Sequence, residues 1–128
     1  MYELTIKGDF ASAHFLPGYQ GNCKDLHGHT WKVEVTVNSE KLDTIGMVVD
    51  FKIIKEEFKN FLMSIDHVCL NDLPYFKKVN PTTEHLAKYI FDEFGKAGLP
   101  TGQAGLPLTI VKVRVWESDT SDVTYYKK

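Results

Sequence analysis

Residues 50–66, DFKIIKEEFKNFLMSID, decide the fold class, because the apolar pattern of the chain changes its period there. Apolar residues recur at intervals of three and four, as on one face of an α-helix, at Phe51, Ile54, Phe58, Phe61, Leu62 and Ile65. Asp50 stands where a helix N-cap residue is expected. The stretch therefore predicts an amphipathic helix.

Upstream of this helix, apolar residues recur at every second position. Residues 2–7 and residues 29–37 each place apolar side chains at every second position, which predicts two half-buried strands. The turn signal Pro17-Gly18 lies between them, so we expect the strands to pair antiparallel.

Downstream, the helical period returns once. Leu86, Ile90 and Phe94 form one stripe, and either Thr82 or Thr83 can cap the start of this second helix.

The last part of the chain predicts a hairpin. Residues 96–107 are rich in glycine and proline and indicate a loop. Two alternating segments, 108–118 and 122–128, follow it around a turn. The order ββααββ makes residues 1–128 a single α+β domain, with an antiparallel sheet and two helices on one face.

Two helices can cover only one face of such a sheet. The other face would carry mostly polar side chains, namely Lys32, Glu34, Thr36, Lys112 and Arg114, together with Trp116. Two sheet edges would also stay unpaired, and closing several sheets edge to edge around a symmetry axis removes such edges. We therefore expect a homo-oligomer.

The composition of the 128 residues is that of an ordinary globular protein, with 43% hydrophobic and 25% charged residues. A net charge of −2 argues against nucleic acid or an anionic membrane as the partner. No apolar run approaches the ~20 residues of a membrane span, and the first residues lack the pattern of a signal peptide. Two cysteines are too few for a disulfide framework, so we expect a cytoplasmic protein.

His27 and His29 lie two residues apart at the start of the second predicted strand. Their imidazoles leave one face with Cα atoms about 6.6 Å apart, so both can reach one metal ion, although hydrogen-bonded histidines at a strand end have the same pattern. His14 follows the alternation of the first strand and supplies a third imidazole. Three histidines and one open position are the ligand set of catalytic zinc, which favours a metal site.

Cys23 stands four residues before His27. It can close the metal site as a fourth ligand, or it can lie beside an open site, where a cation favours the thiolate and makes it a base or nucleophile. It can also be a small buried hydrophobe, which is our interpretation of Cys69. The spacing does not separate these roles.

Asp66 and His67 follow the first predicted helix. A carboxylate beside an imidazole can orient the ring for catalysis, whereas a histidine at a helix C-terminus also interacts well with the helix dipole. On these two residues alone, the dipole interpretation is favoured.

Glu117 follows Val111, Val113 and Val115 at every second position of the predicted strand, so its side chain is expected on the same, apolar face. A carboxylate there favours a pair of donors, such as the amino–amide edge of a bound heterocycle, or else it lies in solvent at the strand end. Thr82, Thr83 and Glu84 are by themselves ordinary residues of a helix start.

Five segments occur in the order found in the 6-pyruvoyltetrahydropterin synthase family, which the chain resembles from its first strand to its last. They are FASAHFLPGY (10–19), CKDLHGH (23–29), Asp66-His67 with Leu70-Asn71, PTTE (81–84) and Trp116-Glu117. Their joint presence is more specific than any one of them. Within the family, the chain looks most similar to the 6-carboxytetrahydropterin synthase branch of queuosine biosynthesis.

The resemblance implies a T-fold, whose ββααββ subunits associate into a barrel, usually a hexamer of two stacked trimers with active sites between subunits. It implies a zinc ion on His14, His27 and His29, with Cys23 as the proton-abstracting base.

The same resemblance implies roles for the other candidates. Asp66 and His67 would be the relay partner of the base. Glu117 would anchor the pterin and is grouped with the relay, and the pterin pocket would be lined by Thr82, Thr83 and Glu84.

The implied reaction converts 7,8-dihydroneopterin triphosphate to 6-carboxy-5,6,7,8-tetrahydropterin, with release of acetaldehyde and triphosphate. The sister reaction of the family forms the pyruvoyl product without carbon–carbon cleavage, and no residue here separates the two. A non-catalytic oligomer that binds zinc or pterin is a further alternative. His27, His29 and Glu34 have the spacing of the first metal motif of a cupin. A cupin is disfavoured, because the alternation of the strand places Glu34 on the opposite face from the two histidines.

Overall fold

Four antiparallel strands form one sheet in the order β1-β2-β3-β4, so each strand pairs with the next one in sequence. The computed structural model describes residues 1–19, 25–103, 105 and 107–128. The strands are β1 (Tyr2–His14), β2 (His27–Ser39), β3 (Thr109–Ser118) and β4 (Ser121–Tyr125). Two helices, α1 (Phe51–Met63) and α2 (Thr83–Glu93), lie between β2 and β3 in the chain. The predicted order ββααββ and the α+β class are confirmed.

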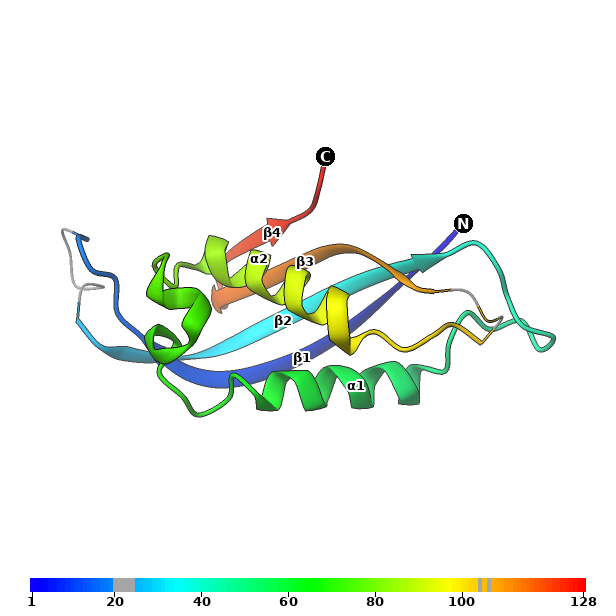
Figure 1. Cartoon of the computed structure of the whole chain (residues 1–128), viewed down its shortest axis with the longest axis horizontal. Helices are drawn as coiled ribbons and strands as arrows, with labels where there is room; N and C mark the ends of the chain where they lie inside the picture. Colours follow the sequence, from blue (N-terminus) through cyan, green and yellow to red (C-terminus); the bar gives the residue numbers. More distant parts are fainter. Residues whose placement is uncertain (20–24, 104, 106) are drawn as a thin grey trace.

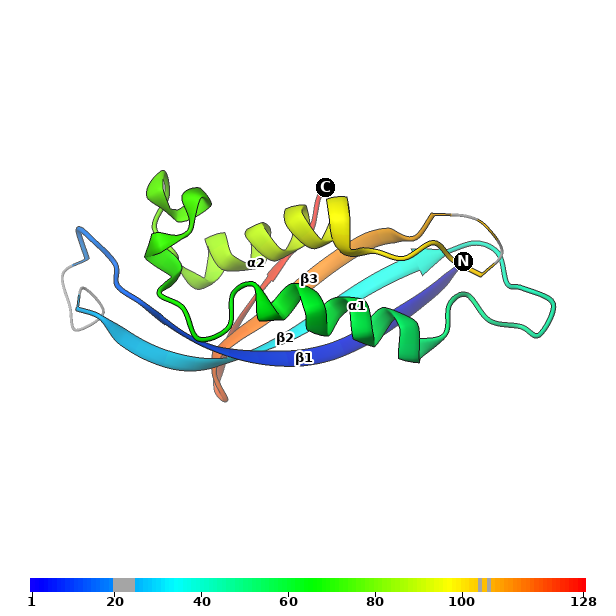
Figure 2. The same ribbon diagram turned by 60° about the horizontal axis from the view of Figure 1, so that its bottom comes forward.

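Both helices cover the same face of the sheet (Figure 1). α1 packs over β1, and α2 packs over β3 and β4, so the two helices run side by side along the sheet (Figure 2). The hydrophobic core lies between these two layers. The predicted arrangement, with two helices on one face, is therefore confirmed.

α1 begins where the sequence predicts. The Asp50 carboxylate accepts a hydrogen bond from the Lys52 N–H at 2.8 Å and so caps the first turn. The helix buries Ile54, Phe58 and Leu62. Gly8 on β1 permits the close approach, because a Cβ at that position would lie 2.8 Å from Cδ1 of Leu62.

α2 is capped by Thr82, whose hydroxyl accepts a hydrogen bond from the His85 N–H at 3.1 Å. The predicted stripe of Leu86, Ile90 and Phe94 is fully buried. Phe94 belongs to η4 (Phe94–Gly98), a single π turn that follows α2 directly.

β1 is longer than predicted and runs on to His14. The outer edge of its last part pairs with the chain that follows α1. The His67 N–H donates to the Ala11 carbonyl at 2.6 Å, and the Ala13 N–H donates to the Val68 carbonyl at 3.0 Å. Two short 3-10 helices, η2 (Leu70–Asp72) and η3 (Pro74–Lys77), come next and were not predicted.

The face of the sheet away from the helices carries ion pairs, as its polar sequence predicts. Lys7 pairs with Glu34 at 3.1 Å, and Arg114 pairs with Asp122 at 2.9 Å while lying over the ring of Trp116. In the described part of the chain, no helix is long and apolar enough to cross a membrane. The homo-oligomer expected from the open edges stays a prediction.

Candidate metal centre

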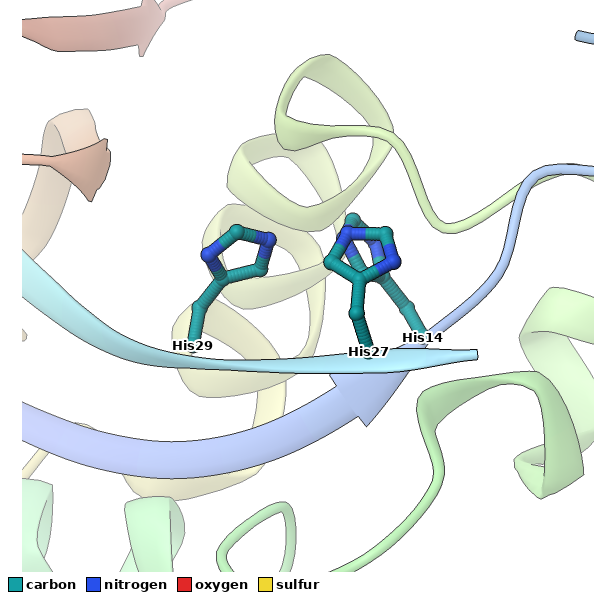
Figure 3. A group of neighbouring side chains, drawn as sticks. All are labelled: His14, His27 and His29. Atoms are coloured by element: carbon teal, nitrogen blue, oxygen red, sulfur yellow. The ribbon is translucent and has the colours of Figure 1, made fainter. Parts of the chain in front are cut away.

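Three histidines meet at one end of the sheet. The antiparallel register places His14, the last residue of β1, opposite His27, the first residue of β2. His29 lies two residues further along β2 and therefore on the same face. Figure 3 shows the rings of His27 and His29 rising from β2 beside the ring of His14 from β1. One ring nitrogen from each lies within 4.8 Å of the others.

Backbone carbonyls orient two of these rings. The Nδ1 atom of His14 lies 2.8 Å from the Pro81 carbonyl, and the Nδ1 atom of His27 lies 2.7 Å from the Asp25 carbonyl. A carbonyl oxygen only accepts hydrogen bonds, so Nδ1 carries the proton in both rings and Nε2 keeps its lone pair. The ring tautomers are thus those that a metal ion requires.

The Nε2 atoms of all three histidines are shielded from solvent and, among the described residues, have no hydrogen-bond partner. A buried polar atom without a partner destabilises the fold, unless a ligand that the site is built to hold supplies the missing interaction. Three converging lone pairs suit a divalent cation such as zinc. The donor set therefore fits the metal ion that the sequence predicts.

Burial keeps His14 and His29 ready to bind a cation. Burial lowers the pKa of His14, the Pro81 carbonyl opposes that shift, and the neighbouring imidazoles add to it. Burial also lowers the pKa of His29, against the opposing effect of the Glu117 carboxylate. A lowered pKa keeps an imidazole neutral near pH 7, and only the neutral ring binds a metal.

Glu117 lies beside this cluster, as its effect on the pKa of both His14 and His29 indicates. It is half-buried, and the Thr83 hydroxyl donates a hydrogen bond to its Oε2 atom at 3.1 Å. The parity of β3 thus indicated the correct face for Glu117, although the strand is irregular at this end.

The three residues at the start of α2 differ in their surroundings. Thr83 is buried and Thr82 caps the helix, whereas Glu84 is exposed to solvent. Of these three, the structure brings Thr83 into contact with another candidate residue, Glu117.

The Asp66–His67 pair lies elsewhere, on the outer edge of β1. One oxygen of Asp66 accepts from the Ala11 N–H at 2.8 Å, and the other lies 2.9 Å from Nδ1 of His67. The Ala11 N–H, followed by His67, lowers the pKa of Asp66. His67 adopts a left-handed backbone conformation, with φ of 56°, and 81% of its side chain is exposed.

His67 and Cys69 border a hollow of about 560 Å³, together with Ala13, Gly28 and His29. The pair thus lies at the outer edge of β1, where His67 and His29 line the same hollow. Among the described residues, the ring nitrogens that converge are those of His14, His27 and His29, and the Asp66–His67 pair is not part of this cluster.

Cys23 lies outside the described residues, and its role stays a prediction. Sequence reasoning missed the Pro81 and Asp25 carbonyls, because backbone groups leave no signal in residue types. It also gave no role to Asn71, which is buried and whose side-chain amide pairs with both the N–H and the carbonyl of Phe15. This pairing fixes the chain directly after His14.

Comparisons with known proteins agree with this geometry. The 6-pyruvoyl tetrahydropterin synthase from Caenorhabditis elegans superposes over all of this chain and 98% of its own, with a TM-score of 0.78 and 26% identity. A 6-carboxy-5,6,7,8-tetrahydropterin synthase from Synechocystis is 36% identical, covering 98% of this chain and 94% of the relative. A human 6-pyruvoyl tetrahydrobiopterin synthase is 40% identical, covering 82% and 70%.

A four-stranded antiparallel sheet that carries two helices on one face and matches such a structure is a T-fold. Together, the sheet and the histidine cluster define a T-fold protein with a candidate metal centre. The family model described as 6-pyruvoyl tetrahydropterin synthase matches residues 3–128. The chain belongs to the 6-pyruvoyl tetrahydropterin synthase family.

Proposed function

We propose that the chain is a zinc-dependent lyase that converts 7,8-dihydroneopterin triphosphate and water to 6-carboxy-5,6,7,8-tetrahydropterin, acetaldehyde and triphosphate. The observation that carries the proposal is the convergence of three shielded Nε2 atoms beside the Glu117 carboxylate. A relative named for this product matches nearly the whole chain, which also supports residues 1–128 as one pterin synthase domain of the queuosine pathway.

His14, His27 and His29 would hold the zinc ion through their Nε2 atoms. When bound, zinc polarises oxygen atoms of the substrate side chain and so acidifies the protons on the neighbouring carbons. The carbonyls of Pro81 and Asp25 hold two of the rings in the required tautomer before any ion arrives. Such outer contacts favour metal binding because they reduce the freedom that the ligands lose.

Glu117 would anchor the pterin through the amino–amide edge of the heterocycle, which presents a pair of hydrogen-bond donors. The Thr83 hydroxyl already donates to Oε2 and so holds the carboxylate in one orientation. Thr82 and Glu84, at the same helix start, would complete the pocket.

The proton transfers would involve Cys23 and the Asp66–His67 pair. The Cys23 thiolate removes a proton from a side-chain carbon of the substrate, and His67 returns one. Because Nδ1 of His67 faces Asp66, Nε2 is the atom left to exchange the proton.

The positions of these residues favour an oligomeric active site. Within one chain, the Asp66–His67 pair lies at the outer edge of β1 and is not part of the histidine cluster. The proposal therefore places the pair from one copy beside the cluster of another, in a homohexamer of two trimers.

The pyruvoyl-forming reaction is the second candidate, because the human relative named for that product is 40% identical over most of this chain. It uses the same residue roles without carbon–carbon cleavage. Incubating the zinc-loaded protein with 7,8-dihydroneopterin triphosphate and identifying the products by mass spectrometry separates the two. Acetaldehyde with the carboxylated pterin supports the proposal, a pyruvoyl product supports the sister reaction, and no turnover would favour a non-catalytic binding protein.

Replacing Cys23 with alanine tests the role of the base. We expect Cys23→Ala to abolish turnover and to keep one zinc ion per chain, because three histidines suffice as ligands. Cys69→Ala, which removes the other thiol, is the matched control and should keep both properties. Loss of zinc from Cys23→Ala would instead make Cys23 a metal ligand.

A further inference from the structure

One buried aromatic residue touches the metal cluster from the side of the core. Trp31 follows His27 and His29 on the same face of β2 and is 0% exposed. Its ring centroid lies 5.1 Å from that of His14 and 5.1 Å from that of His29. Both contacts are edge-to-face, with interplanar angles of 85° and 67°. A single indole therefore packs against two candidate ligands that come from different strands.

The indole is itself fixed in place. Its Nε1–H donates a hydrogen bond to the Ser12 carbonyl at 3.3 Å, and its ring stacks on Phe10, with centroids 6.2 Å apart. Phe10 and Ser12 belong to β1 and lead directly to His14. The hydrogen bond to the Ser12 carbonyl does not involve the Phe10 side chain, so it would still hold the indole in a variant that lacks the Phe10 ring.

We propose that Trp31 is the positioning residue of the metal centre. A histidine ring turns through a broad range about its last side-chain bond, so three rings converge on one point only if each is restrained. The Pro81 carbonyl restrains the ring of His14, and the packed edge of Trp31 sets the angle between His14 and His29.

Trp31 also lies on the core side of the cluster. The indole follows His29 on β2, packs against its ring and is fully buried. This inference rests on the metal site of the proposed function. It adds a residue that determines how tightly, and with what geometry, the ion is held.

Three variants of the full-length protein test the inference with zinc alone. Trp31→Phe removes the indole N–H and part of the contact with both histidines. Phe10→Leu removes the aromatic ring that stacks on the same indole, and Trp116→Phe makes the same chemical change on the far side of the sheet. Zinc affinity is measured by competition with a chelator, and the stability of each metal-free variant is measured by urea unfolding.

We expect Trp31→Phe to bind zinc about 10-fold more weakly or worse, which is the usual effect of losing an outer contact of a metal ligand. Trp116→Phe should match the wild type, and Phe10→Leu should keep its zinc affinity even where it loses as much stability as Trp31→Phe. Equal zinc affinity in Trp31→Phe and the wild type, or equal losses in Trp31→Phe and Phe10→Leu, would overturn the inference.

Cobalt provides a second readout in variants that fold. The chain has two tryptophans, so Trp31 is the sole indole in Trp116→Phe. We expect Co²⁺ to quench its fluorescence strongly, and the visible absorption bands of bound Co²⁺ to shift in Trp31→Phe but not in Phe10→Leu. Absence of quenching would overturn the inference. Failure of the wild type to bind either ion would overturn the proposed zinc dependence together with it.

Discussion

At the scale of single residues, the metal centre depends on ring orientation more than on residue type. His85 shows the distinction, because its Nδ1 also lies against a backbone carbonyl, that of Asn80, at 2.7 Å. Its Nε2 nevertheless does not join the cluster that His14, His27 and His29 form. The shielded, converging Nε2 atoms are the feature that separates a candidate ligand from an ordinary hydrogen-bonded histidine.

Replacing His27 with glutamine tests this distinction. We expect the zinc content of His27→Gln to fall well below one ion per chain, because two imidazoles leave the ion with too few strong donors. His85→Gln is the matched control and should keep its zinc. Metal analysis of the purified proteins gives the result, and a full complement of zinc in His27→Gln would remove it from the ligand set.

The Asp66 carboxylate gives the fold a dependence on pH. The pKa of Asp66 is lowered, first by the Ala11 N–H and then by His67. A carboxyl whose pKa is depressed by folding stabilises the protein above its unfolded pKa and loses that contribution as the pH falls through the folded value. We expect the stability gap between the wild type and Asp66→Asn to be present at about pH 6 and to shrink below about pH 4. Urea unfolding at several pH values measures this gap, and a constant gap would contradict the assignment.

At the scale of elements, the contact between α1 and β1 depends on one missing side chain. A Cβ at Gly8 would lie 2.8 Å from Leu62 and 3.0 Å from Phe58, both of which α1 buries. At Gly28, on the same sheet, a Cβ would meet no atom within 4 Å among the described residues other than its chain neighbours.

These two glycines allow a paired test. We expect Gly8→Ala to lower the free energy of unfolding by about 1–3 kcal/mol, the usual range for overpacking a core. Gly28→Ala should have little effect on unfolding of the chain, because open space surrounds it. Denaturant titration compares the two, and equal effects would show that α1 accommodates the extra methyl group.

The spacing of apolar residues predicted the helices and strands, because each element buries one face and that face must be apolar. The alternation of β2 and the three-to-four spacing of α1 both reflect one apolar face, and both elements were located from it. The end of β1 was less clear: the strand was predicted only for residues 2–7, because residues 8–13 are mainly small or polar, although its alternation could be followed to His14. Its partner at residues 67–69 was not predicted either, because the pairing uses backbone atoms.

The candidate site divides in the same way. The alternation of the strands indicated the common face of His14, His27, His29 and Glu117. The structure brings the three histidines together, and the Glu117 carboxylate opposes the burial that lowers the pKa of both His14 and His29. The alternation could not indicate that the Asp66–His67 pair lies at the edge of β1, since that depends on how the chain runs after α1.

At the scale of the whole molecule, the proposed function needs the Asp66–His67 pair and the histidine cluster in one active site, although within one chain the pair is not part of the cluster. If the active site joins two copies, one variant can lack the metal cluster and another can lack the pair, and each still offers what the other has lost. Symmetric assembly of the mixture would then rebuild some intact sites.

Complementation measures this directly. We expect His27→Gln and His67→Ala to be inactive alone and to regain part of the wild-type activity when coexpressed. A double variant carrying both changes in one chain, coexpressed with itself, is the control and should stay inactive. No recovery in a mixture shown to form mixed oligomers would mean that each site is built within one chain.

Because the register places His14 opposite His27, the segment that connects them begins and ends at neighbouring positions of the sheet. An ion held by both residues would fasten the two ends of that segment, and Cys23 lies only four residues from His27 in the chain. Four extended residues span at most ~14 Å, so the thiol would be tethered within that distance of the ligand backbone. A short tether raises effective concentration into the millimolar range without any added contact. The length of the chain alone thus keeps the proposed base near the ligands, with or without the ion.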